Sequence, residues 1–65
     1  MKLFHYFVSY YWLENNRWKP ANCEIDRGSE IKTGHDIKSL EEAVGRNRGL
    51  KVVTIMNFIL LHVEG

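Results

Sequence analysis

Two long segments of the chain are apolar on both faces when they are read as β-strands. Side chains along a strand point alternately to its two faces, and in residues 3–12 both alternating sets are mainly aromatic or aliphatic. Residues 50–61 repeat this pattern with aliphatic side chains. Because aromatic and β-branched residues pack well on a pleated surface, we expect strands over residues 2–13 and 50–63.

Residues 18–27 follow a different pattern, in which polar residues alternate with Cys23 and Ile25. A strand with one polar face suits the edge of a sheet, and Pro20, which has no backbone N–H to donate, is also tolerated there. The preceding Glu-Asn-Asn-Arg segment, residues 14–17, contains two asparagines that tolerate a left-handed backbone. The pattern predicts a β-hairpin that joins the first strand to a polar edge strand.

The next element is predicted to be a helix. Its apolar residues lie three and four positions apart and so share one face: Ile37, Leu40, Ala43 and Val44. Thr33 suits the N-cap because its hydroxyl can accept a hydrogen bond from a free backbone N–H, and Asp36 places negative charge at the positive end of the helix dipole. Ser39 is an alternative cap. Gly45 or Gly49 is expected to end the helix.

These elements predict an α+β fold with a small antiparallel-type sheet, in the order strand, strand, helix, strand. The two apolar strands are expected to lie side by side at the centre, with the polar strand outside and the helix across one face, over Phe4, Tyr6 and Val8. One narrow helix covers only one face. Because soluble monomers rarely expose large contiguous apolar patches, we expect the other face to be buried in a homo-oligomer. The residues predicted at this oligomer interface are His5, Phe7, Ser9, Tyr11, Val53, Ile55 and Ile59.

The length and the cysteine content support the same expectation. The chain has 65 residues and one cysteine, Cys23, so we expect residues 1–65 to form a single domain without an intrachain disulfide. A core of this size supplies only about 3 to 5 kcal/mol, and association between copies is a common further source of stability. A lone thiol suits a reducing compartment, so we expect a buried, unreactive cysteine and a cytoplasmic protein.

The charge balance argues against some classes of partner. Nine Lys and Arg residues against eight Asp and Glu residues give a formal net charge of +1. Proteins that are held to nucleic acid mainly through phosphates are far more basic. The apolar runs are too short or too interrupted by polar residues to cross a bilayer, and no signal-peptide cleavage site follows the first run. We therefore expect no membrane association.

No set of residues predicts catalysis or a bound metal. His5, His35 and His62 are far apart in the sequence and show no recognisable ligand spacing. The adjacent pair of His35 and Asp36 would need a nearby nucleophile for acid–base work, and Ser9 lacks the strained turn of an activated serine. We therefore expect a protein that is not an enzyme and that needs no metal, cofactor or disulfide.

The loop after the helix is the best candidate for contact with nucleic acid or another partner. Arg46, Arg48 and Lys51 place three positive charges within six residues. Trp12 and Trp18, where exposed, provide platforms on which single-stranded bases could stack. The alternative is that the arginines complement the negative end of the helix dipole, while the aromatic residues fill a core or an interface.

Three segments give the chain the look of very short accessory proteins encoded by phages and prophages. They are Tyr-Phe-Val-Ser-Tyr-Tyr at residues 6–11, Asp-Ile-Lys-Ser-Leu-Glu at residues 36–41 and Val-Val-Thr-Ile-Met-Asn-Phe at residues 52–58. The chain resembles these proteins in size, architecture and sequence texture. The resemblance implies a stoichiometric inhibitor of a host enzyme or of a defence system, as anti-CRISPR proteins are, or a small nucleic-acid binder.

The leading hypothesis from the sequence is a non-enzymatic, oligomeric binding protein that occupies the surface of a macromolecular protein target, as a phage-type anti-defence inhibitor does. The alternative is a single-stranded nucleic-acid-binding protein that uses residues 46–51 and exposed aromatic residues. A third hypothesis, a small enzyme or nucleotide-binding protein built at a subunit junction, requires residues from separate chains.

Overall fold

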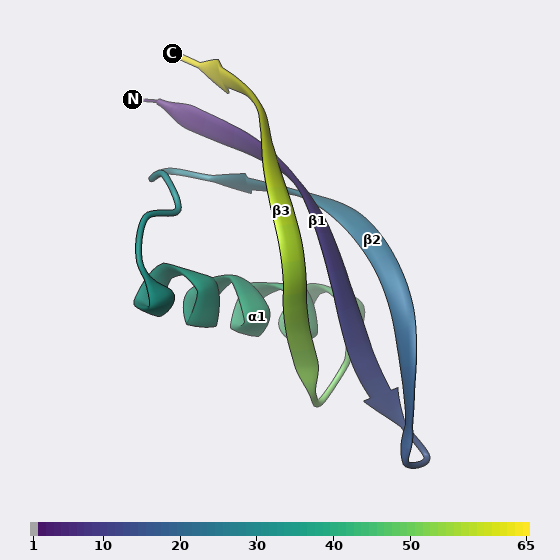
Figure 1. The fold of residues 1–65 in the computed structure, drawn as a ribbon. Helices are drawn as coiled ribbons and strands as arrows, with labels where there is room; N and C mark the ends of the chain where they lie inside the picture. The colour runs from purple at the N-terminus through teal and green to yellow at the C-terminus, as the bar shows by residue number, and fades with distance from the viewer. Residues whose placement is uncertain (1) are drawn as a thin grey trace.

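The computed structural model describes residues 2–65, which form one helix and three strands (Figure 1). Strands β1 (Leu3–Glu14) and β2 (Arg17–Arg27) are followed by helix α1 (Gly34–Arg48) and strand β3 (Val53–Glu64). The strands form one antiparallel sheet in the order β2-β1-β3. The predicted α+β fold and the order of its elements are confirmed.

A tight turn joins β1 to β2. Glu14 pairs with Arg17, and the two residues between them, Asn15 and Asn16, have φ angles of 51° and 62°. Two successive left-handed residues are the geometry of a type I′ turn, whose twist matches that of the paired strands. Asparagine tolerates this backbone better than most residues other than glycine, and the predicted hairpin is confirmed.

Helix α1 begins and ends at signals that lie close by in the sequence. The N-cap is Thr33, whose Oγ1 accepts a hydrogen bond from the N–H of Asp36 at 3.2 Å, while the Asp36 carboxylate accepts one from the N–H of Thr33 at 3.1 Å. Gly49 ends the helix with a φ of 69°, which glycine adopts without strain. Ser39 and Gly45, the alternative cap and end, lie inside the helix; a Cβ at Gly45 would lie 3.0 Å from a backbone oxygen of the following loop.

The core lies between α1 and one face of the sheet. Its most buried side chains are Tyr6, Val8, Tyr10, Leu40 and Val44. Tyr6 also has a polar role, because its hydroxyl accepts a hydrogen bond from the N–H of Ile31 at 2.8 Å and so pairs two buried groups. The helix therefore covers the face of β1 that was predicted from the sequence.

Strand β3 lies at an edge of the sheet and not at its centre, because only β1 has a neighbour on both sides. The predicted pairing of the first and last strands is nevertheless present. The register between β1 and β3 shifts twice, so that Leu61 and Met56 have no partner on β1, as in β-bulges. Each shift by one residue moves the following side chains to the opposite face of the sheet.

The bulge at Met56 overturns one predicted placement. Strict alternation would put Val53 and Ile55 on the same face as Ile59. Instead Val53 pairs with Trp12 and Ile55 pairs with Tyr10, and both pack against the core on the helix side. The expectation that these two residues face away from the helix is wrong.

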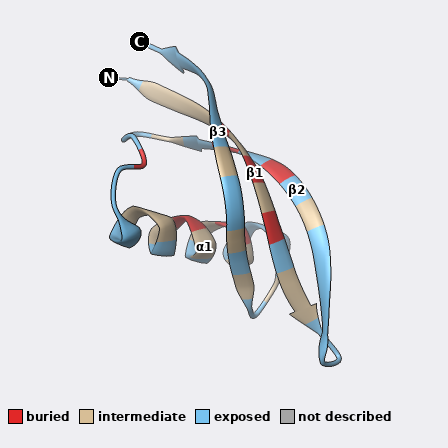
Figure 2. Cartoon of the chain, viewed as in Figure 1, coloured by how far each residue is buried: buried red, intermediate tan, exposed pale blue. Residues whose placement is uncertain are grey.

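The helix leaves the other face of the sheet, which we call the open face, without cover. Figure 1 shows α1 crossing behind β3 and β1, and the described chain is elongated, with extents of 41 × 19 × 18 Å. The buried residues of the strands lie on β1 and β2, whereas most of β3 is exposed (Figure 2). Within residues 2–65, no helix combines the length and the apolar character that a membrane span requires.

Candidate functional site

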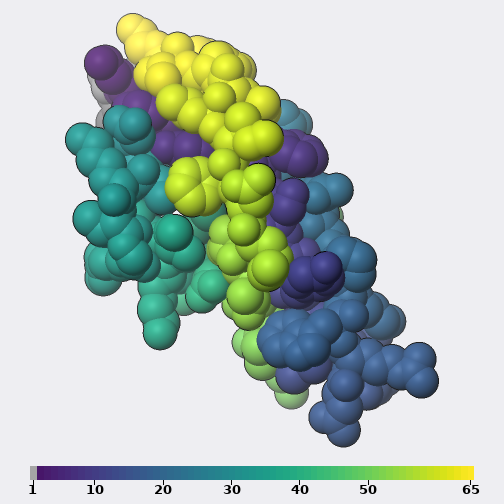
Figure 3. Space-filling view, in the orientation of Figure 1, coloured from purple at the N-terminus to yellow at the C-terminus, as the bar shows by residue number. Residues whose placement is uncertain are grey.

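Strand β3 and the residue before it expose large apolar side chains on both faces of this sheet edge, since Ile59 pairs with Phe7 on the open face and Leu60 pairs with Tyr6 on the helix side. The exposed fractions lie between 40% and 58%, and the residues, which we call the apolar strip, are Val52, Met56, Ile59, Leu60, Leu61 and Val63. In the space-filling view, the side chains of β3 form a continuous band along the visible face (Figure 3). An edge strand of this kind offers unpaired backbone groups beside apolar side chains, so it is a template for pairing with another strand.

The sequence of β3 explains why this edge has no protection. Natural edge strands carry charges or proline that discourage pairing, but no charged residue lies between Val53 and Leu61. The two bulges add to the apolar surface, because the bulge residues Met56 and Leu61 are 58% and 48% exposed. Soluble monomers rarely expose so many large apolar side chains together, so the apolar strip is a candidate interaction surface.

Tyr11 and Trp18 extend the apolar surface across the open face. They are 39% and 52% exposed, and together with Thr54 and Met56 they line a shallow hollow. The predicted interface residues that lie on this face are His5, Phe7, Ser9, Tyr11 and Ile59. Their burial in an oligomer stays a prediction.

One point on the edge of β3 is already occupied by the helix. The N–H of Ile55 donates a hydrogen bond to Oε2 of Glu41 at 3.1 Å. This side chain takes the place of a partner strand at that position. The stretch that remains suited to strand pairing lies nearer the C-terminal end of β3, beyond Met56.

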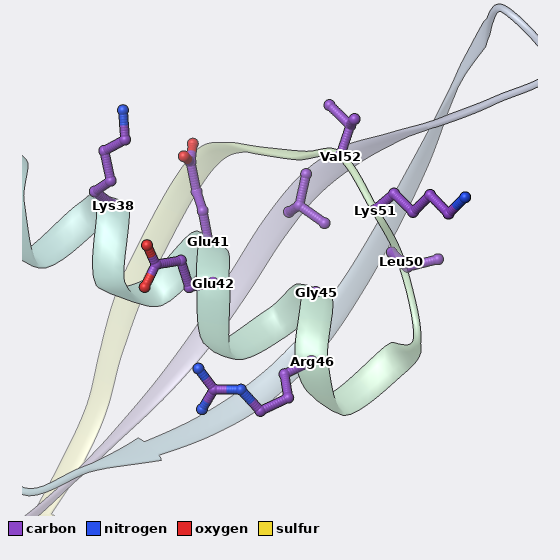
Figure 4. Close-up of a pocket in the computed structure, with 9 residues that line it drawn as sticks. Lys38, Glu41, Glu42, Gly45, Arg46, Leu50, Lys51 and Val52 are labelled. Carbon is purple, nitrogen blue, oxygen red and sulfur yellow. The ribbon is translucent and has the colours of Figure 1, made fainter.

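The basic residues expected in a loop after the helix do not gather on one positive surface, because Arg46 and Arg48 lie in the last turn of α1 and only Lys51 follows it. Arg46 and Lys51 line a groove between α1 and β3, but Glu41 and Glu42 line the same groove (Figure 4). Figure 4 also shows the side chain of Lys51 pointing away from those of the two glutamates. Acidic side chains beside the cations oppose the binding of phosphate, so this groove is a poor site for a nucleic-acid backbone.

The third basic residue, Arg48, interacts with Cys23. Burial raises the pKa of the Cys23 thiol, and the nearby guanidinium of Arg48 lowers it by a smaller amount, so the pKa is raised overall. A thiol in this state is a weak nucleophile. Cys23 lies in the core cluster, so the expectation of a buried cysteine is confirmed.

The two tryptophans lie on opposite faces of the sheet. Trp12 packs against the core on the helix side, and Nζ of Lys19 lies 5.2 Å from the centre of its ring. Trp12 is partly buried and is therefore a poorer stacking platform than an exposed ring. Trp18 is exposed, but it lies with Tyr11 on the open face. The two rings and the basic residues consequently do not form one stacking surface.

A second feature of the open face is a group of four polar side chains, which we call the acid–histidine cluster: His5, Asp26, His62 and Glu64. His5 and His62 pair across β1 and β3, and their rings stack with centroids 4.1 Å apart. Nδ1 of His5 lies 2.6 Å from Asp26 Oδ1, and Nε2 lies 2.5 Å from Glu64 Oε1. Nε2 of His62 lies 3.9 Å from the same oxygen of Glu64.

The two carboxylates stabilise the protonated form of His5. Partial burial lowers the pKa of His5, but hydrogen bonds to Glu64 and Asp26 and the negative charges of these residues outweigh it, so the pKa is raised. In the protonated ring both nitrogens donate, one to each carboxylate. The cluster thereby links all three strands of the sheet at one end.

This cluster was not predicted from the sequence, because His5 and His62 come from opposite ends of the chain. The available signal was the predicted antiparallel pairing of the first and last strands, which brings the start of one beside the end of the other. That signal does not fix the register, and the register depends on the bulge at Leu61.

No protein-family model matches the chain, and neither a curated protein nor a solved structure is significantly similar to it. Function is therefore inferred from the site itself.

Proposed function

We propose that this chain is a non-enzymatic binding protein that works as a homo-oligomer, in the simplest case a dimer formed through β3. The observation that carries the proposal is the exposed apolar strip on an edge strand whose residues 53–61 carry no charge. Such an edge recruits another strand, and burial of its apolar side chains stabilises the pair. A core of this small size also benefits from the stability that association adds.

The occupant of the edge is a second copy of the same strand. In an antiparallel pair of β3 strands related by a two-fold axis, the same patch serves both copies. The stretch of β3 beyond Met56, where the edge is not occupied by Glu41, contains Ile59, Leu60 and Leu61. A two-fold axis near Leu60 therefore pairs this apolar stretch with its own copy.

The dimer presents each remaining surface twice, and we propose that it acts by occupying the surface of a macromolecular protein target. The resemblance to short phage and prophage proteins supports the narrower proposal that the target belongs to the host or to its defence system. The single cysteine, buried and unreactive, supports a cytoplasmic location.

The test of association is the molar mass in solution, measured by light scattering at micromolar concentration. We expect a dimer for the wild type and a folded monomer for Ile59→Asp, because a carboxylate buried without a partner in the interface is costly. Asn22→Asp is the matched control, since it places the same charge at an exposed, polar position of strand β2. A wild-type monomer at this concentration, or equal dissociation by both changes, would contradict the proposal.

Binding to unstructured oligonucleotides tests the alternative from the sequence. We expect only weak binding at physiological salt, because acidic residues share the groove of Arg46 and Lys51. Submicromolar binding that falls steeply with salt, and that disappears when Arg46, Arg48 and Lys51 are all neutralised, would replace the protein-target proposal with a nucleic-acid one.

A further inference from the structure

The acid–histidine cluster combines three side chains that can ligate a metal ion. One ligand atom from each of His5, His62 and Glu64 can be chosen so that all three atoms lie within 4.8 Å of one another. We infer that these residues form a binding site for a divalent transition-metal cation of the zinc class. This inference does not depend on the proposed function, because all three ligands come from one copy of the chain.

The types of ligand point to the class of cation. Two imidazole nitrogens and one carboxylate oxygen are a common three-residue set for Zn²⁺, with water or another group in the fourth position. Imidazole also suits copper and nickel, whereas Ca²⁺ and Mg²⁺ prefer oxygen ligands alone. The cluster should therefore discriminate strongly between these two groups of ions.

The distances are close to those that a bound ion requires. Ligand atoms around a tetrahedral Zn²⁺ with bonds of about 2.0 to 2.2 Å are separated by about 3.3 to 3.5 Å. The two separations from Glu64 Oε1, 2.5 Å to His5 Nε2 and 3.9 Å to His62 Nε2, lie on either side of that range. The ring of His62, which stacks on that of His5, has to rotate out of the stack to ligate the same ion, and the side chains of His62 and Glu64 are 60% and 66% exposed, so they are free to adjust.

The remaining ligand, His5, is held in the orientation that a ligand needs. Its side chain is only 18% exposed, and its Nδ1–H donates to Asp26 at 2.6 Å. A carboxylate that accepts from one ring nitrogen of a histidine fixes the tautomer and leaves the other nitrogen as the ligand. A bound cation would take the place of the proton between His5 Nε2 and Glu64, while the contact with Asp26 remained.

The test is calorimetric titration of untagged protein with ZnCl₂, because a polyhistidine tag would bind the same ion. We expect one zinc ion per chain and an affinity that falls at least about 100-fold in His62→Gln, since a lost ligand should cost at least as much as a lost second-shell partner. His35→Gln is the matched control, because it makes the same change at an exposed histidine at the start of α1, and its affinity should equal that of the wild type.

Two further measurements separate ligation from a general effect of charge. The nitrogen chemical shift of His5 Nε2 should move on zinc addition, and Asp26→Asn should weaken binding by about 10- to 100-fold through the orientation of His5. Mg²⁺ should not displace zinc. Folded wild-type protein that binds no zinc, or equal affinities of the wild type and folded His62→Gln, would overturn the site.

Discussion

The covered face and the open face of the sheet are built from alternate residues of the same strands, yet their environments are opposite. On β1, Tyr6 and Val8 are 2% and 0% exposed beneath the helix, whereas Tyr11 on the open face is 39% exposed. On β3, Ile59 of the open face is 54% exposed. Both faces carry apolar side chains, but the single helix covers only one. The chain thus contains more apolar surface than it can bury alone, and the uncovered part is suited to association.

The largest effect is expected when one aliphatic side chain is removed from the covered core and, for comparison, one from the open face. Leu40 is 1% exposed and contacts the covered face, so Leu40→Ala should lower the free energy of unfolding by about 2 to 5 kcal/mol. Ile59→Ala, measured by urea denaturation at a concentration where the chain is monomeric, should cost less than about 1 kcal/mol. A loss below about half a kcal/mol for Leu40→Ala would mean that the helix does not stabilise the covered face.

An intermediate effect is expected from hydroxyl groups on the two faces. Tyr6→Phe leaves the buried N–H of Ile31 without an acceptor and should cost about 1 to 3 kcal/mol in chemical denaturation. Tyr11→Phe removes the same group from an exposed ring, where water replaces it, and should change stability by less than about 0.5 kcal/mol. Equal losses would show that the burial of the two faces differs less than the structure indicates.

The features that were predicted correctly from the sequence depend on interactions between neighbouring residues. Asn15 and Asn16 specify the turn because few other residues accept a left-handed backbone twice in succession. Thr33 and Asp36 specify the helix start through hydrogen bonds that span three residues. At the turn the residue types and their spacing suffice, whereas at the helix start they left Ser39 as an alternative cap, which the structure places inside the helix.

The features that were not predicted depend on the register between strands that are distant in the sequence. The run from Val53 to Leu61 is apolar almost throughout, so no alternation of polar and apolar residues reveals the bulge at Met56. For this reason Val53 and Ile55 were assigned to the wrong face. The contact of His5 with His62 was missed for the same reason, because it requires knowledge of which residues pair.

The smallest expected effect concerns the cap that holds the start of the covering helix. Hydrogen bonds from the N–H groups of Lys32 and Thr33 lower the pKa of Asp36, against a smaller opposing effect of partial burial. Asp36 therefore stabilises the fold above the pKa of about 3.9 that is usual for an unfolded aspartate, and this contribution is lost as pH falls through the lower pKa of the folded state.

Asp36→Asn should remove this contribution near neutral pH, so that the difference in unfolding free energy between this variant and the wild type shrinks on acidification. Glu30→Gln, at an exposed acid outside the cap, is the control and should show a weaker trend. A difference between the wild type and Asp36→Asn that is constant between neutral and strongly acidic pH would show that the carboxylate charge contributes nothing to the cap.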